Sequence, residues 1–173
     1  MIPRDAEPTL RQLAKGYPVL VITGPRQSGK TTLARQVFNA YPYVSLENPD
    51  QREFVQQDPS GFLRQYSEGV VIDEAQRCPD LFSWLQGVVD EKKRPAHFIL
   101  TGSQQFGLLS GVTQSLAGRS ALLNLLPFTA TELIHADQLA VSLDEVYIWG
   151  VIRLFLIVIW NPLFGMLTMC KRI

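Results

Sequence analysis

Gly24-Pro25-Arg26-Gln27-Ser28-Gly29-Lys30-Thr31 lies between an apolar run, 18–23, and a segment, 30–38, with apolar residues at helical spacing. The octapeptide matches the pattern G-x-x-x-x-G-K-[ST]. The apolar run suits a strand that is buried on both faces. The flanking periodicities therefore predict a strand, a glycine-rich phosphate loop and a helix, in that order.

Each residue type of this loop has a chemical reason. Gly24 and Gly29 let the backbone curl so that successive N–H groups face phosphate oxygens. Lys30 supplies a positive charge for the β- and γ-phosphates, and the Thr31 hydroxyl can ligate Mg²⁺. The N-terminal end of the following helix also favours an anion. We therefore expect ATP and Mg²⁺ here, bound by Gly24, Pro25, Arg26, Gln27, Ser28, Gly29, Lys30, Thr31 and Thr32, with the side chains of Arg26 and Gln27 in solvent.

The rest of the chain up to about residue 135 alternates short apolar runs with amphipathic stretches. Further strands are predicted at 43–46, 69–72, 97–100 and 121–126. Helices are predicted over 50–66 with a break at Asp58-Pro59, over 79–89, and from Thr129 onward. This alternation predicts an α/β fold with a five-stranded, mostly parallel sheet flanked by helices. Ligands of such sheets bind at the carboxyl ends of the strands, where the polar motifs fall.

The bulk composition narrows the class of protein. The 173 residues are 46% hydrophobic and 18% charged, with a formal net charge of zero, which fits one globular domain and gives no overall bias toward polyanions. The two cysteines, Cys78 and Cys170, form neither a metal-ligand spacing nor a disulfide framework. The first five residues contain no apolar signal core. A cytoplasmic location is the expectation.

An acidic pair follows the third predicted strand. Val70-Val71-Ile72 ends in Asp73-Glu74. In phosphoryl transfer, one carboxylate holds Mg²⁺ and another activates the attacking water. We assign Asp73 to the metal and Glu74 to the general base. The alternative is that the pair caps the following helix.

Two further motifs are candidates for the reaction. Thr101 or Ser103, at the end of the fourth strand, could sense the γ-phosphate if that strand lies between the P-loop strand and the acidic strand. Arg119, before the fifth strand, could reach a neighbouring subunit's γ-phosphate as an arginine finger, which would require a homo-oligomer. It could equally pair with a carboxylate of its own chain. The expected catalytic residues are Glu74, Lys30 and Arg119.

Taken together, these residues resemble the AAA-type ATPases of bacteria and archaea that join a P-loop domain to a C-terminal domain of unknown function. The resemblance covers roughly residues 5–150. It implies ATP and Mg²⁺ binding, hydrolysis, and a P-loop strand beside the sensor strand. It does not specify whether the target is DNA, protein or another molecule. The matching stretches are GPRQSGKTTL at 24–33, SLENPD at 45–50, VIDEAQ at 71–76, LTGSQ at 100–104, LAGR at 116–119, LPF at 126–128 and Glu132-Leu133.

The C-terminal residues depart from this family. The apolar run 151–169 is long enough to cross a bilayer, but it contains Arg153 and Asn161-Pro162, and a central charge costs ~3 kcal/mol on insertion scales. In a shifted reading frame, each codon consists of the last base of one codon and the first two bases of the next. The codons of this region permit an amino-acid sequence in that frame that resembles the family's continuation. Trp160-Asn161, for example, must then give Glu. We therefore predict a frameshift near residues 147–150, a domain at 1–148, an aberrant tail at 149–173, and no membrane segment; the nucleotide sequence tests this.

Three functions compete at this point. The first is an ATP-hydrolysing AAA-type domain that lacks part of its chain. The second is a nucleotide-binding remnant without catalytic competence, and the third is a tail-anchored membrane ATPase. A small-molecule kinase fits less well, because Glu74 directly after Asp73 suits the activation of water.

Overall fold

The computed structural model describes residues 2–92, 94–103, 112 and 114–136. Residues 3–128 form one compact unit, and the chain from Thr129 onward belongs to a second. The predicted boundary between residues 148 and 149, the apolar tail and Gln104 of the LTGSQ stretch all lie outside the described residues. Among the described helices, none is both long and apolar enough to cross a membrane.

A five-stranded sheet forms the middle layer of the first unit. Its order is β2-β3-β4-β1-β5, and every pairing is parallel. The strand that precedes the glycine-rich loop, β1, lies directly beside β4, and β4 separates it from the acidic strand β3. The predicted order is thereby confirmed. The strands are β1 (Val19–Thr23), β2 (Tyr43–Ser45), β3 (Val70–Asp73), β4 (Phe98–Thr101) and β5 (Ser120–Asn124).

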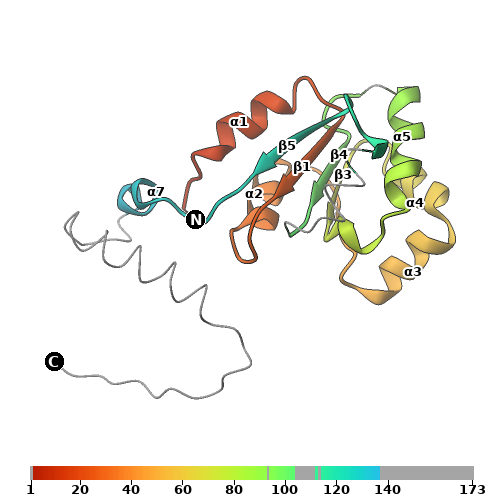
Figure 1. Cartoon of the computed structure of the whole chain (residues 1–173), viewed down its shortest axis with the longest axis horizontal. Coiled ribbons are helices and arrows are strands. Elements are labelled where there is room, and N and C mark those ends of the chain that lie inside the picture. The colour runs from red at the N-terminus through yellow and green to blue at the C-terminus, as the bar shows by residue number, and fades with distance from the viewer. Residues whose placement is uncertain (1, 93, 104–111, 113, 137–173) are drawn as a thin grey trace, which may run out of the picture. The chain divides into compact units, whose positions relative to one another are not determined.

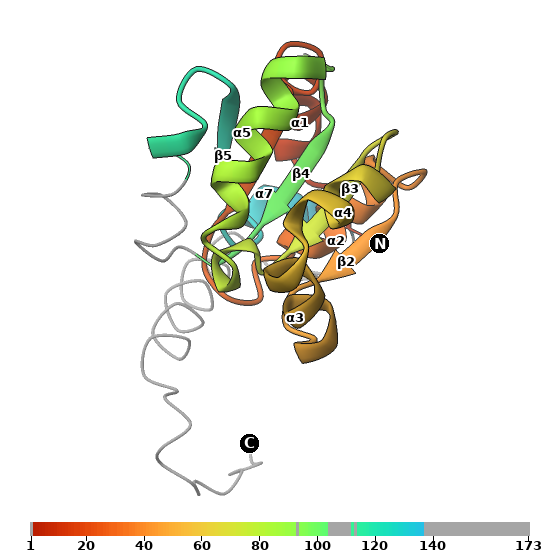
Figure 2. The same cartoon turned by 90° about the vertical axis from the view of Figure 1, so that its right-hand side faces the viewer.

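Helices cover both faces of this sheet, and Figures 1 and 2 show the three layers from two sides. Helices α1 and α2 pack on one face, and α3, α4 and α5 pack on the other. A short 3₁₀ turn, η1, directly follows β3. The helical elements of this unit are α1 (Ala6–Leu13), α2 (Lys30–Val37), α3 (Pro49–Gln57), α4 (Pro59–Gln65), η1 (Ala75–Arg77) and α5 (Leu81–Lys92).

The sheet is apolar on both faces because both are covered. All five residues of β1 are buried, with Val19 and Val21 in the core under α3–α5 and Leu20 and Ile22 in the core under α1 and α2. A central parallel strand must therefore be continuously apolar, as the run 18–23 is. This packing fixes where β1 ends, and so where the loop at Gly24 begins.

The predicted elements match the structure to within a few residues at their ends. The break at Asp58-Pro59 is confirmed, since the Asp58 carboxylate accepts a hydrogen bond from the Gly61 N–H at 2.7 Å and caps α4. Helix α1 was not predicted. Its one fully buried residue, Leu10, offers little periodic signal on a polar segment.

The described part of the second unit is one helix, α7 (Ala130–His135). It begins with a reciprocal capping box: the Glu132 N–H donates to the Thr129 hydroxyl at 3.1 Å, and the Thr129 N–H donates to the Glu132 carboxylate at 2.8 Å. The helix start predicted from this pattern is confirmed.

Candidate functional site

The loop after β1 takes a shape that requires its glycines. Gly24 has φ 146° and Gly29 has φ 87°, which are conformations that residues with a Cβ rarely adopt. A Cβ at Gly24 would lie 2.1 Å from the carbonyl oxygen of Leu125, just beyond β5. The backbone of the loop therefore passes so close to the segment after β5 that a side chain at Gly24 would not fit between them.

Lys30, the first residue of α2, points back into this loop. Its ammonium group donates to the carbonyl oxygens of Pro25 at 2.7 Å and Gly24 at 3.2 Å, and the residue is only 7% exposed. Burial lowers the pKa of Lys30, while the nearby carboxylates of Glu74 and Asp73 act in the opposite direction. A desolvated ammonium held by two exchangeable carbonyls is suited to receive phosphate oxygens instead.

The other loop residues divide into buried and exposed groups. Ser28 is 2% exposed, and its hydroxyl has no hydrogen-bond partner among the described residues. Such an orphaned buried hydroxyl fits a site that binds a polar ligand. Arg26 and Gln27 lie exposed at the tip of the loop, Thr32 is exposed on α2, and Pro25 is partly buried.

Arg4, just before α1, holds the loop from the outside, a contact that the sequence did not reveal. Its guanidinium donates to the Ser28 carbonyl at 2.7 Å and to the Leu126 carbonyl at 2.6 Å. It also stacks over the Phe128 ring, 4.3 Å from the centroid. Arg4 thus joins the loop to the segment that leaves β5, over a sequence separation that no local pattern shows.

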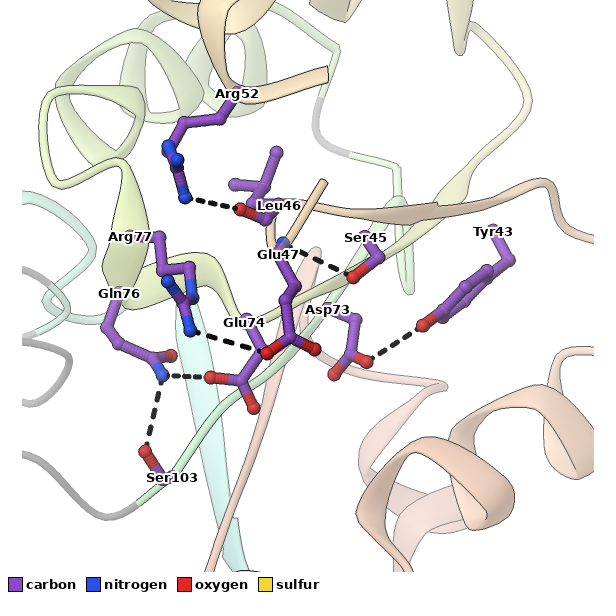
Figure 3. A network of polar contacts seen from close by, with 10 residues as sticks. All are labelled: Tyr43, Ser45, Leu46, Glu47, Arg52, Asp73, Glu74, Gln76, Arg77 and Ser103. Atoms are coloured by element: carbon purple, nitrogen blue, oxygen red, sulfur yellow. Dashed lines mark hydrogen bonds and ion pairs between the residues drawn. The ribbon is translucent and has the colours of Figure 1, made fainter. Parts of the chain in front are cut away.

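Asp73 collects hydroxyl groups from three other elements. The Thr31 hydroxyl donates to its two carboxylate oxygens at 3.1 and 3.2 Å, the Tyr43 hydroxyl donates to it at 2.8 Å, and the Thr101 hydroxyl donates as well. Burial and this bond to Asp73 both raise the pKa of Tyr43. Thr101 is fully buried on β4. The assigned pair Thr31 and Asp73 is therefore adjacent, and Figure 3 shows Tyr43 directed at Asp73.

Tyr43 was not selected as a site residue from the sequence. It is the first residue of the edge strand β2, and no local motif there indicates a function. Its strand pairs with β3 so that Ser45 lies opposite Asp73. In this register the tyrosine hydroxyl lies within hydrogen-bond distance of the carboxylate.

Glu74 adopts an unusual backbone conformation, with φ 54° and ψ 41°. A non-glycine residue in this left-handed region is uncommon and occurs often at functional sites. Its side chain makes no capping hydrogen bond to η1, so capping does not explain Glu74. Instead its carboxylate contacts the Gln76 amide, which also contacts the Ser103 hydroxyl (Figure 3).

The two sensor candidates thus face different carboxylates. Thr101 contacts Asp73 directly, and Ser103 reaches Glu74 only through Gln76.

Arg119 lies at the amino-terminal end of the strands, opposite to the end that carries the glycine-rich loop. It directly precedes β5, whose first residue pairs with Val19 at the start of β1, whereas the loop at Gly24 follows the end of β1. Its guanidinium forms two hydrogen bonds with the carboxylate of Asp90 on α5, at 2.5 and 2.9 Å, and the pair is partly exposed. Arg119 therefore does not join the other site residues within this chain.

The site residues fit a nucleotide and a nucleotide-bound Mg²⁺. In the described part of the chain, no group of three or more His, Cys, Asp or Glu side chains could hold a metal on its own. Mg²⁺ in nucleotide sites characteristically takes one or two protein oxygens and completes its shell with phosphates and water. Thr31 and Asp73 offer that donor set beside the buried ammonium of Lys30.

Solved structures with this architecture include several P-loop proteins. The Walker-type ATPase PABY2304 of Pyrococcus abyssi superposes with a TM-score of 0.56 at 19% identity, over 84% of this chain and 61% of that one. The RuvB Holliday junction branch migration motor of Thermotoga maritima gives 0.52 at 21% identity, over 78% and 49%. At these identities the likeness establishes the fold only.

Sequence comparison identifies the family more closely. Two uncharacterized proteins, Rv2008c of Mycobacterium tuberculosis and Mb2031c of Mycobacterium bovis, are each 41% identical over 132 residues. The match covers 75% of this chain but only 30% of the length of those relatives. The family model described as an AAA domain matches residues 16–134, from before β1 into α7. The chain therefore belongs to the AAA-domain family of P-loop nucleotide-binding proteins.

Proposed function

We propose that this domain binds ATP with Mg²⁺ and hydrolyses it to ADP and phosphate. The proposal rests on one observation, which is that two carboxylates lie beside the P-loop. Asp73 accepts a hydrogen bond from the Thr31 hydroxyl, and Glu74 is the next residue after Asp73 in the chain. A binding site without hydrolysis would need the first of these groups and not the second.

The side chains have separate roles in this proposal. Thr31 and Asp73 would hold Mg²⁺, which when bound neutralises charge on the phosphates. Lys30 exchanges its bonds to loop carbonyls for bonds to phosphate oxygens. Glu74 accepts a proton from the attacking water, as a general base requires. Thr101, the last residue of β4, or Ser103, two residues later, would sense the γ-phosphate.

Arg119 enters the proposal only across a subunit boundary. Because it lies at the start of β5, it cannot serve the loop at the end of β1 in the same chain. An arginine finger at this position would act on a neighbouring copy, so its use requires a homo-oligomer. The ion pair with Asp90 would then have to open.

The test measures phosphate release by the full chain with ATP, with and without Mg²⁺, for the wild type and Glu74→Gln. Replacing the base should lower turnover by about 10²- to 10⁴-fold while ATP binding persists. The matched control is Glu53→Gln, an exposed glutamate on α3, which should leave turnover unchanged. ATP binding by the wild type without Mg²⁺-dependent phosphate release would overturn the proposal.

A further inference from the structure

Among the described residues, Gln76 contacts both Glu74 and Ser103, and the proposed function leaves this side chain without a role. Its amide nitrogen donates to a carboxylate oxygen of Glu74 at 2.5 Å and to the Ser103 hydroxyl at 3.3 Å. Figure 3 shows the amide between the two side chains, one from the end of β3 and one from the segment after β4. Gln76 and Ser103 are 27 residues apart in the chain.

The backbone places Gln76 there by reversing direction after β3. The left-handed conformation of Glu74 ends the strand, and the Arg77 N–H closes the turn by donating to the Glu74 carbonyl at 2.9 Å. Ala75, 1% exposed, anchors the turn in the core. Gln76 therefore returns to Glu74 through a hydrogen-bonded turn whose first residue is buried in the core.

The orientation of the amide is determined by charge. Both contacts use the amide nitrogen, and the amide oxygen is buried without a partner among the described residues. An unsatisfied buried carbonyl is unfavourable. The opposite orientation would set that oxygen against the carboxylate of Glu74. The orientation with the nitrogen toward Glu74 avoids this repulsion.

We infer that Gln76 is a positioning residue that holds the Glu74 carboxylate and couples it to Ser103, so that the response of Ser103 to the γ-phosphate reaches Glu74. The inference rests on the proposed function, in which Glu74 is the base. The amide donates to both groups at once, so a movement of the Ser103 hydroxyl changes the position of the amide and of the carboxylate that it holds. Thr101 has no such path, because it contacts Asp73.

The first experiment compares Gln76→Glu with the wild type in steady-state turnover by the full chain. Glutamate keeps the shape of glutamine but replaces the donor with a second carboxylate, which repels Glu74. We expect kcat to fall by about 10- to 100-fold, the range that misplaced catalytic groups produce, with KM within about twofold. An unchanged kcat, or a loss confined to KM, would overturn the inference.

The chain contains a matched control for this substitution. Gln57 on α3 also donates its amide to a glutamate, Glu53, at 2.9 Å, but on the exposed surface. Gln57→Glu creates the same repulsion away from the site. It should leave kcat and KM unchanged, and an equal loss in both variants would count against a specific role for Gln76.

A double-mutant cycle tests the coupling to Ser103. Ser103→Ala should lower kcat in the wild-type background and change it by less than about twofold in Gln76→Ala, because the path is already broken. Effects that multiply independently would show that Ser103 acts without Gln76 and would overturn the coupling.

A wild-type chain that binds ATP without turnover would contradict the proposed function. In that case, a binding measurement tests the coupling of Gln76 to Ser103 independently of turnover. Calorimetry in the presence of Mg²⁺ measures the affinity of the chain for a non-hydrolysable ATP analogue and for ADP. The quantity to compare between variants is the ratio of the first affinity to the second. Ser103→Ala, Gln76→Ala and the double variant should all change this ratio to the same value. A ratio that Gln76→Ala leaves at its wild-type value overturns the inference.

Discussion

The two ends of the sheet carry similar polar residues in opposite settings. At the carboxyl end, Lys30 is buried against loop carbonyls and Asp73 is surrounded by hydroxyl groups. Near the amino end, Arg119 pairs with Asp90 and Arg94 pairs with Glu68, and both ion pairs are exposed. Lys30 and Asp73 thus make their hydrogen bonds to neutral groups that a ligand can displace, whereas Arg119 and Arg94 are already neutralised by their partners.

The difference follows from the geometry of parallel strands. Because all five strands are parallel, their carboxyl ends lie at the same end of the sheet. The segments that follow the strands converge there, and helix α2 begins there. The convergence brings hydroxyl and carbonyl groups from several elements around Asp73 and Lys30. We expect substitutions at the carboxyl end to change ligand binding and those at the amino end to change little more than stability.

The largest effect should come from Lys30→Ala. The substitution removes the only ammonium that contacts the loop carbonyls of Gly24 and Pro25 in the described residues. We expect the affinity for MgATP to fall on the order of 10²-fold, as for the loss of one strong buried donor. Calorimetric titration of the full chain measures it.

The control for this substitution is Lys15→Ala, an exposed lysine after α1 that should leave the affinity unchanged. Equal affinities for all three chains would contradict the assignment of the loop.

Arg4→Ala should have the next largest effect. It removes two hydrogen bonds from a charged group to the Ser28 and Leu126 carbonyls, so the free energy of unfolding should fall by about 2 kcal/mol. Arg4→Lys should recover only part of this, since an ammonium lacks the planar fork that reaches both carbonyls. Denaturant unfolding of the full chain provides the measurement.

Arg11→Ala is the control for Arg4, because Arg11 makes an exposed ion pair with Glu7 on the same helix. A loss at Arg11 as large as that at Arg4 would show that the contacts of Arg4 with the loop are not what stabilises the fold.

His97, just before β4, should make stability depend on pH. Burial lowers the pKa of His97 from its ordinary value of 6.5, although its contact with the Tyr66 carbonyl at 3.0 Å acts in the opposite direction. The unfolded chain then binds the proton more readily than the folded chain. Stability from this group is present above pH 6.5 and is lost as the pH falls from 6.5 toward the lowered value.

The melting temperature measured between pH 7.5 and 5 should therefore fall more in the wild type than in His97→Gln, which cannot titrate. Parallel pH profiles for the two chains would show that another group is responsible.

The smallest effect on stability is expected for Arg119→Ala and Asp90→Ala. Their ion pair is partly exposed, and such pairs contribute little. Melting temperatures close to that of the wild type are expected for both variants. Turnover separates the two readings of Arg119: a loss in Arg119→Ala alone indicates a finger acting on a neighbouring copy, and equal turnover in both indicates an ion pair only.

Local patterns were sufficient to predict most of the sheet and the loop. The run 18–23 is apolar because β1 is covered on both faces, and the two glycines of G-x-x-x-x-G-K-[ST], Gly24 and Gly29, both have positive φ. The break before Pro59 and the capping box at Thr129 depend on contacts within three residues. Such features are encoded in short segments, so they can be predicted without knowledge of the fold.

The contacts of Arg4, Tyr43 and Gln76 could not be predicted in the same way. Arg4 reaches Leu126 across 122 positions, and Tyr43 reaches Asp73 across 30. Gln76 lies only two residues from Glu74, but its placement needs the left-handed turn at Glu74 and the approach of Ser103 from β4. The sequence pattern around each of these residues is compatible with an ordinary surface position.

The amino-acid sequence by itself determined the class of fold, the glycine-rich loop and the acidic pair, because strand burial, glycine conformations and the lysine of the loop motif each leave a local pattern. The tertiary structure alone decided how these groups are connected. It gave Asp73 three hydroxyl partners, linked Glu74 to Ser103 through Gln76, and placed Arg119 at the opposite end of the strands. The physical reason is that strand order and register, which are set by burial over the whole sheet, determine which distant side chains meet.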